Sequence, residues 1–330
     1  MKAMVLERVE GGSQLALTDV PEPAVGPRQV AVAVRAASIN RADLLQRAGS
    51  YMPGGSPQVL RAGLDAAGQV VAVGEAVKTV TVGDRVMAMA PGGLAERVVV
   101  DETMLVPIPE AWSEAEGAAA VVALMTAHNA LVTAARLREG ESVLVHGAAS
   151  GVGLQTVQLS SFLGAGTVIA TTRSARAADL LRGLGADHVV DVSQVDFISA
   201  VSRIKGDQGV DVIVDHVGGP YLADNVACLS VKGRLVSVGR LAGSTGALDM
   251  ETLALKRLEI IGVTFRTREA EEKDAIAAGV RSLLKTEGAS EALRPTVDRT
   301  LPWTRVEDAY EVMERNAHLG KIVLEVATAN

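Results

Sequence analysis

A glycine-rich turn between a buried strand and a helix limits the possible folds of this chain more than any other feature. The segment VLVHGAASGVGLQ, residues 143–155, places Gly147, Gly151 and Gly153 at the bend, with Ala148 opening an A-x-x-G-x-G pattern. Glycines there let the backbone turn tightly and approach a pyrophosphate, which the N–H groups at the helix start would face. A second apolar strand, TVIATT, follows about 20 residues later, the setting that dinucleotide binding requires. A purely structural turn is the alternative interpretation.

The sequence from residue 141 onward alternates between apolar runs and helical stretches. After TVIATT come DHVVDV, DVIVDHVG and RLVSVG, and LEIIGVTF at 258–265 closes the series. Strands that alternate with helices in this way predict parallel βαβ units and an α/β fold. The tail then adds a helix at EEKDAIAAGVRSLLKTEG, a turn at Leu301-Pro302, a helix at VEDAYEVMERN and a final strand at KIVLEV.

The first 110 residues have a different character. Short Val-rich segments such as QVAVAVRAASIN and DRVMAMA are separated by Gly-Pro, Pro-Gly and Gly-Gly pairs. This pattern predicts short strands in a small β-rich barrel or sandwich. Between the two regions, residues 113–138 predict a helix, in which Ser113 and Glu116 fit a capping box.

The end of the TVIATT strand bears on which dinucleotide binds. Sites that prefer NAD usually have an Asp or Glu there to bind the ribose hydroxyls. This chain instead has Thr172, followed by Arg173, Ser174 and Arg176. An arginine can form a charge-assisted fork with a 2′-phosphate, so the segment predicts NADPH. Solvated arginines at a helix start are the alternative, although cations are unfavourable near a helix N-terminus.

The composition argues against several classes of protein. The formal net charge is −7, with acidic and basic residues mixed along the chain, which disfavours a nucleic-acid or membrane surface. The single Cys228 excludes an internal disulfide and a Cys-rich zinc site. Glu7, Arg8 and Glu10 interrupt the N-terminal segment before a signal-peptide core could form, and the apolar stretch at 118–127 is too short to span a bilayer. We therefore expect a cytoplasmic protein with no nucleic-acid or membrane partner.

Several segments together resemble one protein family over essentially the whole chain. They are ASINRADLLQRAGSY at 37–51, GLDAAGQVVAVGEAVKTVTVGDRV at 63–86, LMTAHNAL, HGAASGVG, GLGADHVVDV, DHVGG and LGKIVLEV. This set resembles the medium-chain dehydrogenase/reductase superfamily, in its zinc-independent, zeta-crystallin-like NADPH:quinone oxidoreductase branch. The resemblance implies a Rossmann domain with a doubly wound parallel sheet at 122–265 and a GroES-like β-rich catalytic domain in two pieces, 1–121 and 266–330. It also implies a homodimer in which the edge strand at 258–265 pairs with its twin.

The resemblance also bears on metal binding. Zinc-dependent relatives have a Cys where this chain has Asn40, and a Gly-His-Glu where it has Gly63-Leu64-Asp65. None of the five histidines forms a spaced metal pair. Because a catalytic zinc needs three protein ligands, we expect no metal.

Without a metal, neutral donors must stabilise the oxyanion that develops when hydride reaches a quinone or an α,β-unsaturated carbonyl. The resemblance places Asn40, Asp43, Tyr51 and Thr126 in that region, and Tyr51, Asn40 and Thr126 are the candidate catalytic residues. Tyr51 lies in GSYMPGG, and its phenol, with an unperturbed pKa of about 10, can donate a hydrogen bond at neutral pH. The alternatives are a loop anchor for Tyr51 and a helix cap for Asn40.

The candidate cofactor-binding residues come from the glycine-rich loop, the end of TVIATT and positions matched to the family. They are Asn40, Asp43, Thr126, Asn129, Ala149, Ser150, Gly151, Val152, Gly153, Thr172, Arg173, Ser174, Arg176, Val217, Gly239, Arg240, Leu241, Val263, Phe265 and Lys321. A solvated lysine at a strand start is the alternative for Lys321. Many relatives have a Lys at the position of Ala177 and a Tyr at that of Val192, so the two arginines would hold the 2′-phosphate without them.

These features predict an NADPH-dependent oxidoreductase that transfers hydride to a quinone or enone substrate. Two alternatives stay open. One is a reductase of another activated alkene, such as an enoyl thioester. The other is a non-enzymatic NADPH-binding structural or RNA-binding protein, against which the lack of a basic or aromatic stripe argues.

Overall fold

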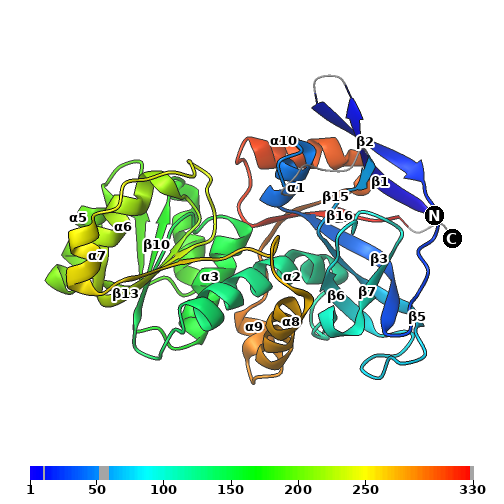
Figure 1. Cartoon of the computed structure of the whole chain (residues 1–330), viewed down its shortest axis with the longest axis horizontal. Coiled ribbons are helices and arrows are strands. Elements are labelled where there is room, and N and C mark those ends of the chain that lie inside the picture. Colours follow the sequence, from blue (N-terminus) through cyan, green and yellow to red (C-terminus); the bar gives the residue numbers. More distant parts are fainter. Residues whose placement is uncertain (10–11, 52–58, 328–330) are drawn as a thin grey trace. The chain divides into compact units, whose positions relative to one another are not determined.

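The computed structural model describes residues 1–9, 12–51 and 59–327 (Figure 1). The chain folds into two compact units. The first unit consists of Met1–Ala123, Arg266–Ser290 and Arg294–Asn330, and the second unit of Leu124–Phe265 and Glu291–Leu293.

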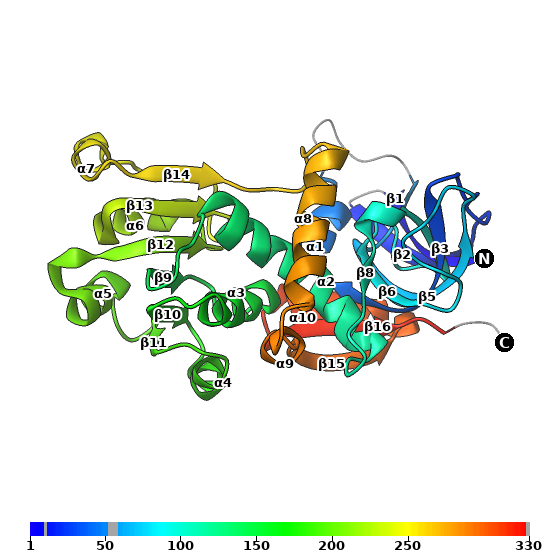
Figure 2. The same ribbon diagram turned by 90° about the horizontal axis from the view of Figure 1, so that it is seen from below.

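The second unit is built on a six-stranded parallel sheet, which confirms the predicted βαβ fold. The strand order is β11-β10-β9-β12-β13-β14 (Figure 2). The bounds are β9 (Ser142–Val145), β10 (Thr167–Thr172), β11 (His188–Asp191), β12 (Val210–Asp215), β13 (Leu229–Ser237) and β14 (Glu259–Gly262). The order runs outward in opposite directions from β9 and β12. In such sheets ligands bind outside the carboxyl ends of the strands at this switch point.

Helices connect these strands and cover the sheet. They are α3 (Gly151–Phe162), α4 (Ala178–Gly183), α5 (Phe197–Lys205), α6 (Leu222–Cys228) and α7 (Met250–Lys256), with short 3₁₀ turns η3 (Ala175–Ala177), η4 (Gly206–Gln208) and η5 (Gly219–Tyr221). Figure 1 shows α5, α6 and α7 gathered on one face of the sheet. Phe197 and Val201 of α5 pack against Leu144, Ile169 and Ile213 of the central strands, so the apolar spacing read from the sequence forms a buried core.

The first unit contains two sheets formed by distant parts of the chain. The smaller sheet has the order β2-β1-β4, and the larger has the order β15-β16-β3-β5-β6-β8, with β7 also paired to β3. The bounds are β1 (Lys2–Val9), β2 (Gly12–Asp19), β3 (Gln29–Ile39), β4 (Val59–Arg61), β5 (Asp65–Val73), β6 (Arg85–Met89), β7 (Arg97–Asp101), β8 (Val106–Pro107), β15 (Val297–Pro302) and β16 (Lys321–Glu325). Because β16 pairs antiparallel with β3, the C-terminal segment completes a sheet begun near the N-terminus.

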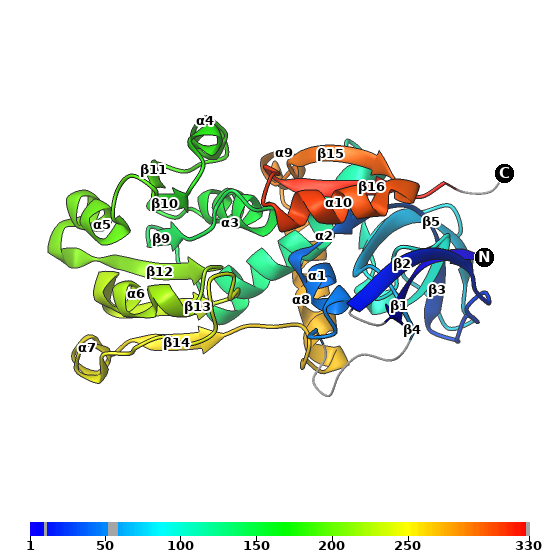
Figure 3. The ribbon, with the colours of Figure 1, turned by 90° about the horizontal axis from the view of Figure 1, so that it is seen from above.

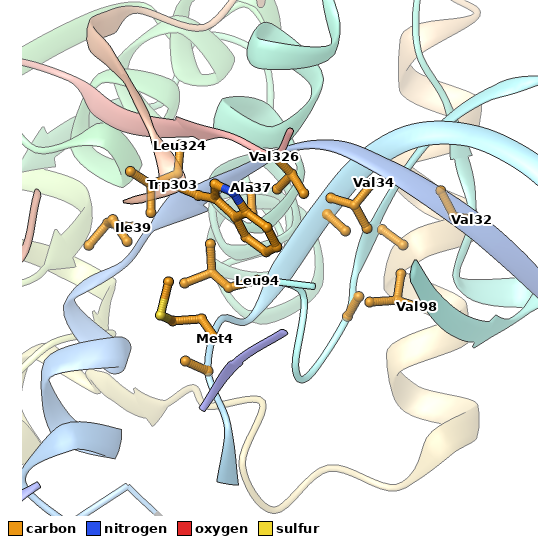
Figure 4. Packing of buried hydrophobic residues seen from close by; sticks show 14 of the residues in the cluster. Met4, Val32, Val34, Ala37, Ile39, Leu94, Val98, Trp303, Leu324 and Val326 are labelled. Atoms are coloured by element: carbon orange, nitrogen blue, oxygen red, sulfur yellow. The ribbon is translucent and has the colours of Figure 1, made fainter. Parts of the chain in front are cut away.

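The first unit also contains helices, some of which contact its larger sheet and one of which contacts the smaller sheet. They are α1 (Arg41–Arg47), α8 (Ala270–Leu284), α9 (Ala289–Ala292) and α10 (Val306–Glu314), with 3₁₀ turns η1 (Glu102–Met104) and η6 (Trp303–Arg305); α9 runs on into the second unit's Glu291–Leu293 segment. Figure 3 shows α10 beside β15 and β16. Trp303 packs with Met4, Leu94 and Leu324 in the core (Figure 4). This one large side chain joins strands from both ends of the chain, in a sequence with few aromatic residues.

The helix α2 (Glu114–His128) follows β8 and continues as a π-helical turn, η2 (Asn129–Ala134). The predicted capping box is confirmed, since Ser113 Oγ accepts the Glu116 N–H at 3.2 Å and the Glu116 carboxylate accepts the Ser113 N–H at 2.7 Å. The segment Glu114–Ala134 is long and apolar enough to cross a membrane by composition. However, 78% of its most apolar stretch is buried within the protein, which identifies it as a core helix.

The turn predicted at Leu301-Pro302 is wrong. Both residues end the strand β15, and the chain turns only at Trp303–Arg305. The strand β15 lies at the edge of its sheet, and proline at an edge position removes no ladder hydrogen bond. The proline therefore marks an edge strand.

Candidate functional site

The glycine-rich loop follows β9 and opens α3, as the sequence predicted. Gly147 has a φ of +65°, and Ser150 caps α3 by accepting the Gly153 N–H at 3.1 Å. A Cβ atom on Gly153 would lie 2.4 Å from the Gly147 carbonyl oxygen, so only glycine permits this close packing of loop on helix. The first N–H groups of a helix have no carbonyl partner within it, which leaves those of Gly151 and Val152 oriented for an anion. The loop therefore fits a dinucleotide pyrophosphate, with Ala149 half-buried beside it.

The end of β10 combines a neutral bend with two exposed cations. Thr172 is buried, and its hydroxyl oxygen accepts the Ser174 N–H at 3.0 Å, so the residue in the acidic position shapes the backbone bend. The Arg173 and Arg176 side chains are exposed. Both cations can therefore reach a phosphate at this end of the sheet.

One carboxylate at this edge was missed by the sequence reasoning. Asp191 ends β11 in register with Thr172, and it accepts hydrogen bonds from the Ser193 hydroxyl at 2.6 Å and the Ser193 N–H at 2.9 Å. These bonds lower the pKa of the Asp191 carboxyl, so it is ionised at neutral pH. The sequence contained the information needed to place Asp191 here, because the last residues of adjacent parallel strands meet at one edge of a sheet.

The loops after β12 and β13 are tied to each other. The Asp215 carboxylate accepts the Val217 N–H at 2.7 Å, and the Asp215 carbonyl accepts the Gly239 N–H at 3.0 Å. A Cβ atom on Gly239 would lie 2.4 Å from the His216 carbonyl oxygen, which shows how closely the two loops approach. The structure therefore brings Val217 next to the loop that also holds Arg240 and Leu241, both exposed. Asp215 is a second residue that the sequence reasoning missed.

The other candidates of the second unit lie at the same edge or on the entering helix. Val263 is buried, and its N–H donates to the Ser237 carbonyl at the end of β13 at 3.0 Å. Phe265 ends this segment and is half-buried. Thr126 is half-buried near the end of α2, and Asn129 is buried at the start of the π-helical turn.

The first unit contains a cluster of buried polar side chains around Asn40. Lys321 Nζ donates to Asn40 Oδ1 at 2.7 Å, and Asn40 Nδ2 donates to Asp65 Oδ2 at 2.7 Å. The Ser38 hydroxyl donates to the same Asp65 oxygen at 2.6 Å. The amide of Asn40 thus lies between a buried ammonium group and a buried carboxylate. Lys321 is only 4% exposed, so the solvated-lysine interpretation is wrong.

Asp43 joins this cluster from the first turn of α1. Its carboxylate accepts the Asn40 N–H at 2.6 Å, which is one half of a capping box. Burial raises the pKa of Asp43 to about 7, with the charge of Asp65 adding to the effect and that of Lys321 opposing it. Burial also raises the pKa of Asp65 and lowers that of Lys321. One positive and two potentially negative groups therefore share a dry site near neutral pH.

Tyr51 is half-buried and lies against an arginine of the same unit. The Arg266 guanidinium carbon is 5.9 Å from the centre of the Tyr51 ring, and Arg266 donates to the Tyr51 carbonyl at 3.0 Å. Burial raises the pKa of the Tyr51 phenol, and the charge of Asp43 adds to this, so the phenol is protonated at neutral pH. The rest of the predicted substrate lid, from Met52 on, lies outside the described residues.

Among the residues that the structure describes, no group of three or more His, Cys, Asp or Glu side chains is arranged to hold a metal ion. Cys228 is a free, buried thiol at the end of α6. Burial raises its pKa to about 12, so this thiol is neither a nucleophile nor a ready metal ligand.

Comparison with known proteins gives two family-model matches and many relatives. Residues 26–110 match the alcohol dehydrogenase GroES-like domain, and residues 151–280 match the zinc-binding dehydrogenase model. A quinone oxidoreductase of Rattus norvegicus is 32% identical over 93% of this chain and 92% of that protein. The synaptic vesicle membrane protein VAT-1 homolog of Homo sapiens is 31% identical over 98% and 86%. A mycocerosic acid synthase-like polyketide synthase of Mycobacterium tuberculosis is 33% identical over 92% of this chain, which spans 14% of that protein's length.

Solved structures share the architecture over nearly the whole chain. An NAD-dependent alcohol dehydrogenase has a TM-score of 0.86 at 27% identity, covering 99% of this chain and 100% of that one. A mycobacterial protein in complex with NADPH has a TM-score of 0.84 at 28% identity, covering 98% and 100%. The CurK enoyl reductase has a TM-score of 0.86 at 26% identity, covering 98% and 99%. With its parallel-sheet unit, its GroES-like unit and its quinone oxidoreductase relatives, the chain belongs to the medium-chain dehydrogenase/reductase superfamily, in its zinc-independent quinone oxidoreductase branch.

Proposed function

We propose that this chain transfers hydride from NADPH to a quinone or an α,β-unsaturated carbonyl compound without the help of a metal. The observation that carries the proposal is the loop at Gly147–Gly153, where only glycine permits the packing and the helix start can accept a pyrophosphate. The likeness to the rat quinone oxidoreductase and to the mycobacterial NADPH complex supports the acceptor and the cofactor. The partner would be a small molecule, and the protein would act in the cytoplasm.

The side chains of this protein have separate tasks in the proposed reaction. NADPH supplies the hydride when it is bound. The loop residues Ala149–Gly153 bind the pyrophosphate, and Arg173 and Arg176 bind the 2′-phosphate. The turn held by Asp215 presents the backbone of Val217. The protonated phenol of Tyr51 donates a hydrogen bond to the acceptor oxygen, where negative charge develops.

A panel of acceptors tests this function. Consumption of NADPH is followed spectroscopically with a quinone, an enone and an enoyl thioester, each over a range of concentrations. Turnover of the quinone or the enone is expected. Turnover of the thioester alone would favour a second candidate function, reduction of an activated thioester alkene, which the likeness to the CurK enoyl reductase supports. Cofactor binding without turnover of any acceptor would favour a non-enzymatic protein.

We expect Tyr51→Phe to lower turnover while leaving NADPH affinity unchanged, because the substitution removes only the hydroxyl. Loss of one oxyanion donor costs about 10²–10³ in rate in strongly preorganised sites, so we expect a smaller loss of about 10-fold for a reactive quinone and a larger one for an enone. Steady-state kinetics over acceptors of decreasing electrophilicity measure this trend. Equal turnover of variant and wild type across the series would leave Tyr51 as a loop anchor.

We also expect the purified protein to hold no stoichiometric zinc and to keep its activity in the presence of chelators. Asn40 and Leu64 occupy the positions of zinc ligands in the zinc-dependent relatives. The Asn40 amide already forms hydrogen bonds with Lys321 and Asp65. Elemental analysis after exhaustive dialysis measures the zinc content per chain. About one zinc ion per chain would contradict the proposal, because a catalytic site needs three protein ligands.

A homodimer formed through β14 is a further part of the proposal. The strand lies at the sheet edge, where its outer N–H and C=O groups have no strand partner among the described residues, and Ile260 on it is 40% exposed. We expect light scattering to give twice the chain mass, and Ile260→Asp to shift the protein toward monomer by placing like charges together. Val82→Asp, at an exposed position of the first unit, serves as the control. A monomeric wild type would exclude this interface.

A further inference from the structure

We infer that His146 and Asn225 are positioning residues for the cofactor. A buried chain of hydrogen bonds through their side chains joins the ends of β9, β10 and β12. These strand ends carry the phosphate loop, the arginine segment and the Val217 turn of the proposed cofactor site. This inference depends on cofactor binding alone and holds for any acceptor.

The chain of hydrogen bonds runs across the carboxyl edge of the sheet. His146 follows β9, with its Nδ1 2.9 Å from the Thr171 hydroxyl oxygen on β10 and its Nε2 2.7 Å from Asn225 Oδ1 on α6. Asn225 Nδ2 donates to Asp215 Oδ2 at 3.2 Å, and Asp215 Oδ1 accepts the Val217 N–H at 2.7 Å. His146 and Asn225 are fully buried, so water does not compete for these bonds.

The hydrogen-bond partners determine how the Asn225 amide is oriented and which ring nitrogen of His146 carries the proton. The Asp215 carboxyl group accepts the Val217 and Gly218 N–H groups, so the Asn225 amide directs its NH₂ group toward it and its oxygen toward His146. An amide oxygen only accepts, so His146 Nε2 carries the proton and Nδ1 accepts from the Thr171 hydroxyl. Phe197 and Tyr221 enclose the ring edge-on, with centroids at 4.6 and 4.9 Å. Burial lowers the pKa of His146 to about 4, so the ring stays neutral.

Each link of the chain lies next to a different part of the cofactor site. His146 directly precedes Gly147 of the phosphate loop, and Thr171 directly precedes Thr172 and the arginines. Asp215 holds Val217, whose carbonyl in turn accepts the Ala242 N–H at 2.9 Å. The sheet itself keeps its ladder, in which the His146 N–H donates to the Val214 carbonyl, whatever side chain occupies position 146.

From these contacts we can predict which ligands bind more weakly when the chain of hydrogen bonds is broken. A dinucleotide must reach the phosphate loop, the end of β10 and the loops after β12 and β13 at once, whereas a fragment contacts only one of them. Loosening the chain would let these loops move independently. Breaking these hydrogen bonds should therefore weaken the binding of the whole dinucleotide more than the binding of a fragment.

The test uses His146→Phe, which suits the aromatic surroundings and removes both side-chain bonds, and Thr171→Val, which removes one hydroxyl. Ser142→Ala is the matched control. It removes the 2.7 Å bond between the hydroxyl of the buried Ser142 and the Asp211 carboxylate, at the opposite end of the same strand. Calorimetry measures the Kd of NADPH and of the fragment 2′-AMP, which carries the 2′-phosphate but neither the pyrophosphate nor the nicotinamide, and thermal unfolding measures stability. NMR of the wild type reports which ring nitrogen of His146 carries the proton.

We expect NADPH affinity to fall about 10-fold or more in His146→Phe and about 3-fold in Thr171→Val, since one hydrogen bond contributes roughly 0.5–1.5 kcal/mol. Affinity for 2′-AMP should change much less, and Ser142→Ala should lower only stability. Unchanged NADPH affinity in Thr171→Val, equal losses for the fragment and the dinucleotide, or a proton on Nδ1 would each overturn the inference. A wild type that binds NADPH but reduces no acceptor would refute the proposed function alone.

Discussion

Lys321→Met is expected to reduce the free energy of unfolding by about 3–5 kcal/mol, the usual cost of removing one member of a buried charge cluster. Methionine keeps most of the side-chain volume but leaves Asp65 and Asp43 without the buried ammonium group that now reaches Asp65 through the Asn40 amide. Denaturant unfolding monitored by circular dichroism measures the loss. The exposed Lys78→Met is the control and should change stability far less.

The loss of stability in Lys321→Met should be smaller at low pH than at high pH. Without Lys321 the pKa of the two carboxyl groups, already raised by burial, rises further. An acid whose pKa is raised in the folded state favours folding at low pH, and that contribution is lost as the pH rises through the folded-state pKa. The variant should therefore be closer to wild type at pH 5 than at pH 8. A loss of the same size at both values would mean that Lys321 acts through packing alone.

Arg173→Ala is expected to weaken NADPH binding by roughly 10–150-fold, because a hydrogen bond to a charged group contributes about 1.5–3 kcal/mol. The exposed guanidinium directly follows Thr172, which occupies the position of the carboxylate in NAD-preferring sites. NADH lacks the 2′-phosphate, so its affinity should hardly change. Calorimetry with both cofactors measures the difference.

Two features of the site make this experiment more informative. The Asp191 carboxylate lies in register with Thr172, so a negative charge stands at the same sheet edge as Arg173. Arg182→Ala on α4 is the control, since that arginine is exposed and bonds to Asp179 on its own helix. Equal loss of both cofactors in Arg173→Ala would make the arginine structural. Tighter binding of NADH by the wild type would contradict the cofactor assignment.

The parts of the fold that depend on local pattern could be predicted from the sequence. The glycine-rich turn, the alternation of strands and helices and the Ser113–Glu116 capping box each involve residues close in the chain. The Leu301-Pro302 turn was misplaced because a proline at a sheet edge looks the same in sequence as one in a turn.

The side-chain networks could not be predicted in this way. The bonds of His146 to Thr171 and Asn225 join residues 25 and 79 positions apart, and they exist only because β9 lies between β10 and β12. Lys321 reads as a surface lysine until β16 is known to pair with β3. Resemblance to the family located both Asn40 and Lys321, but not the hydrogen bond between them.

The pairing of β16 with β3 also has a consequence for synthesis of the chain on the ribosome. Lys321 leaves the exit tunnel 281 residues after Asn40, its hydrogen-bond partner. At about 5–20 residues per second, the nascent N-terminal strands wait on the order of tens of seconds for the strand and the cation that complete them. During that interval the whole of Leu124–Phe265 emerges as one continuous stretch. The parallel-sheet unit can therefore fold first, and the unit that begins the sequence is the last to close.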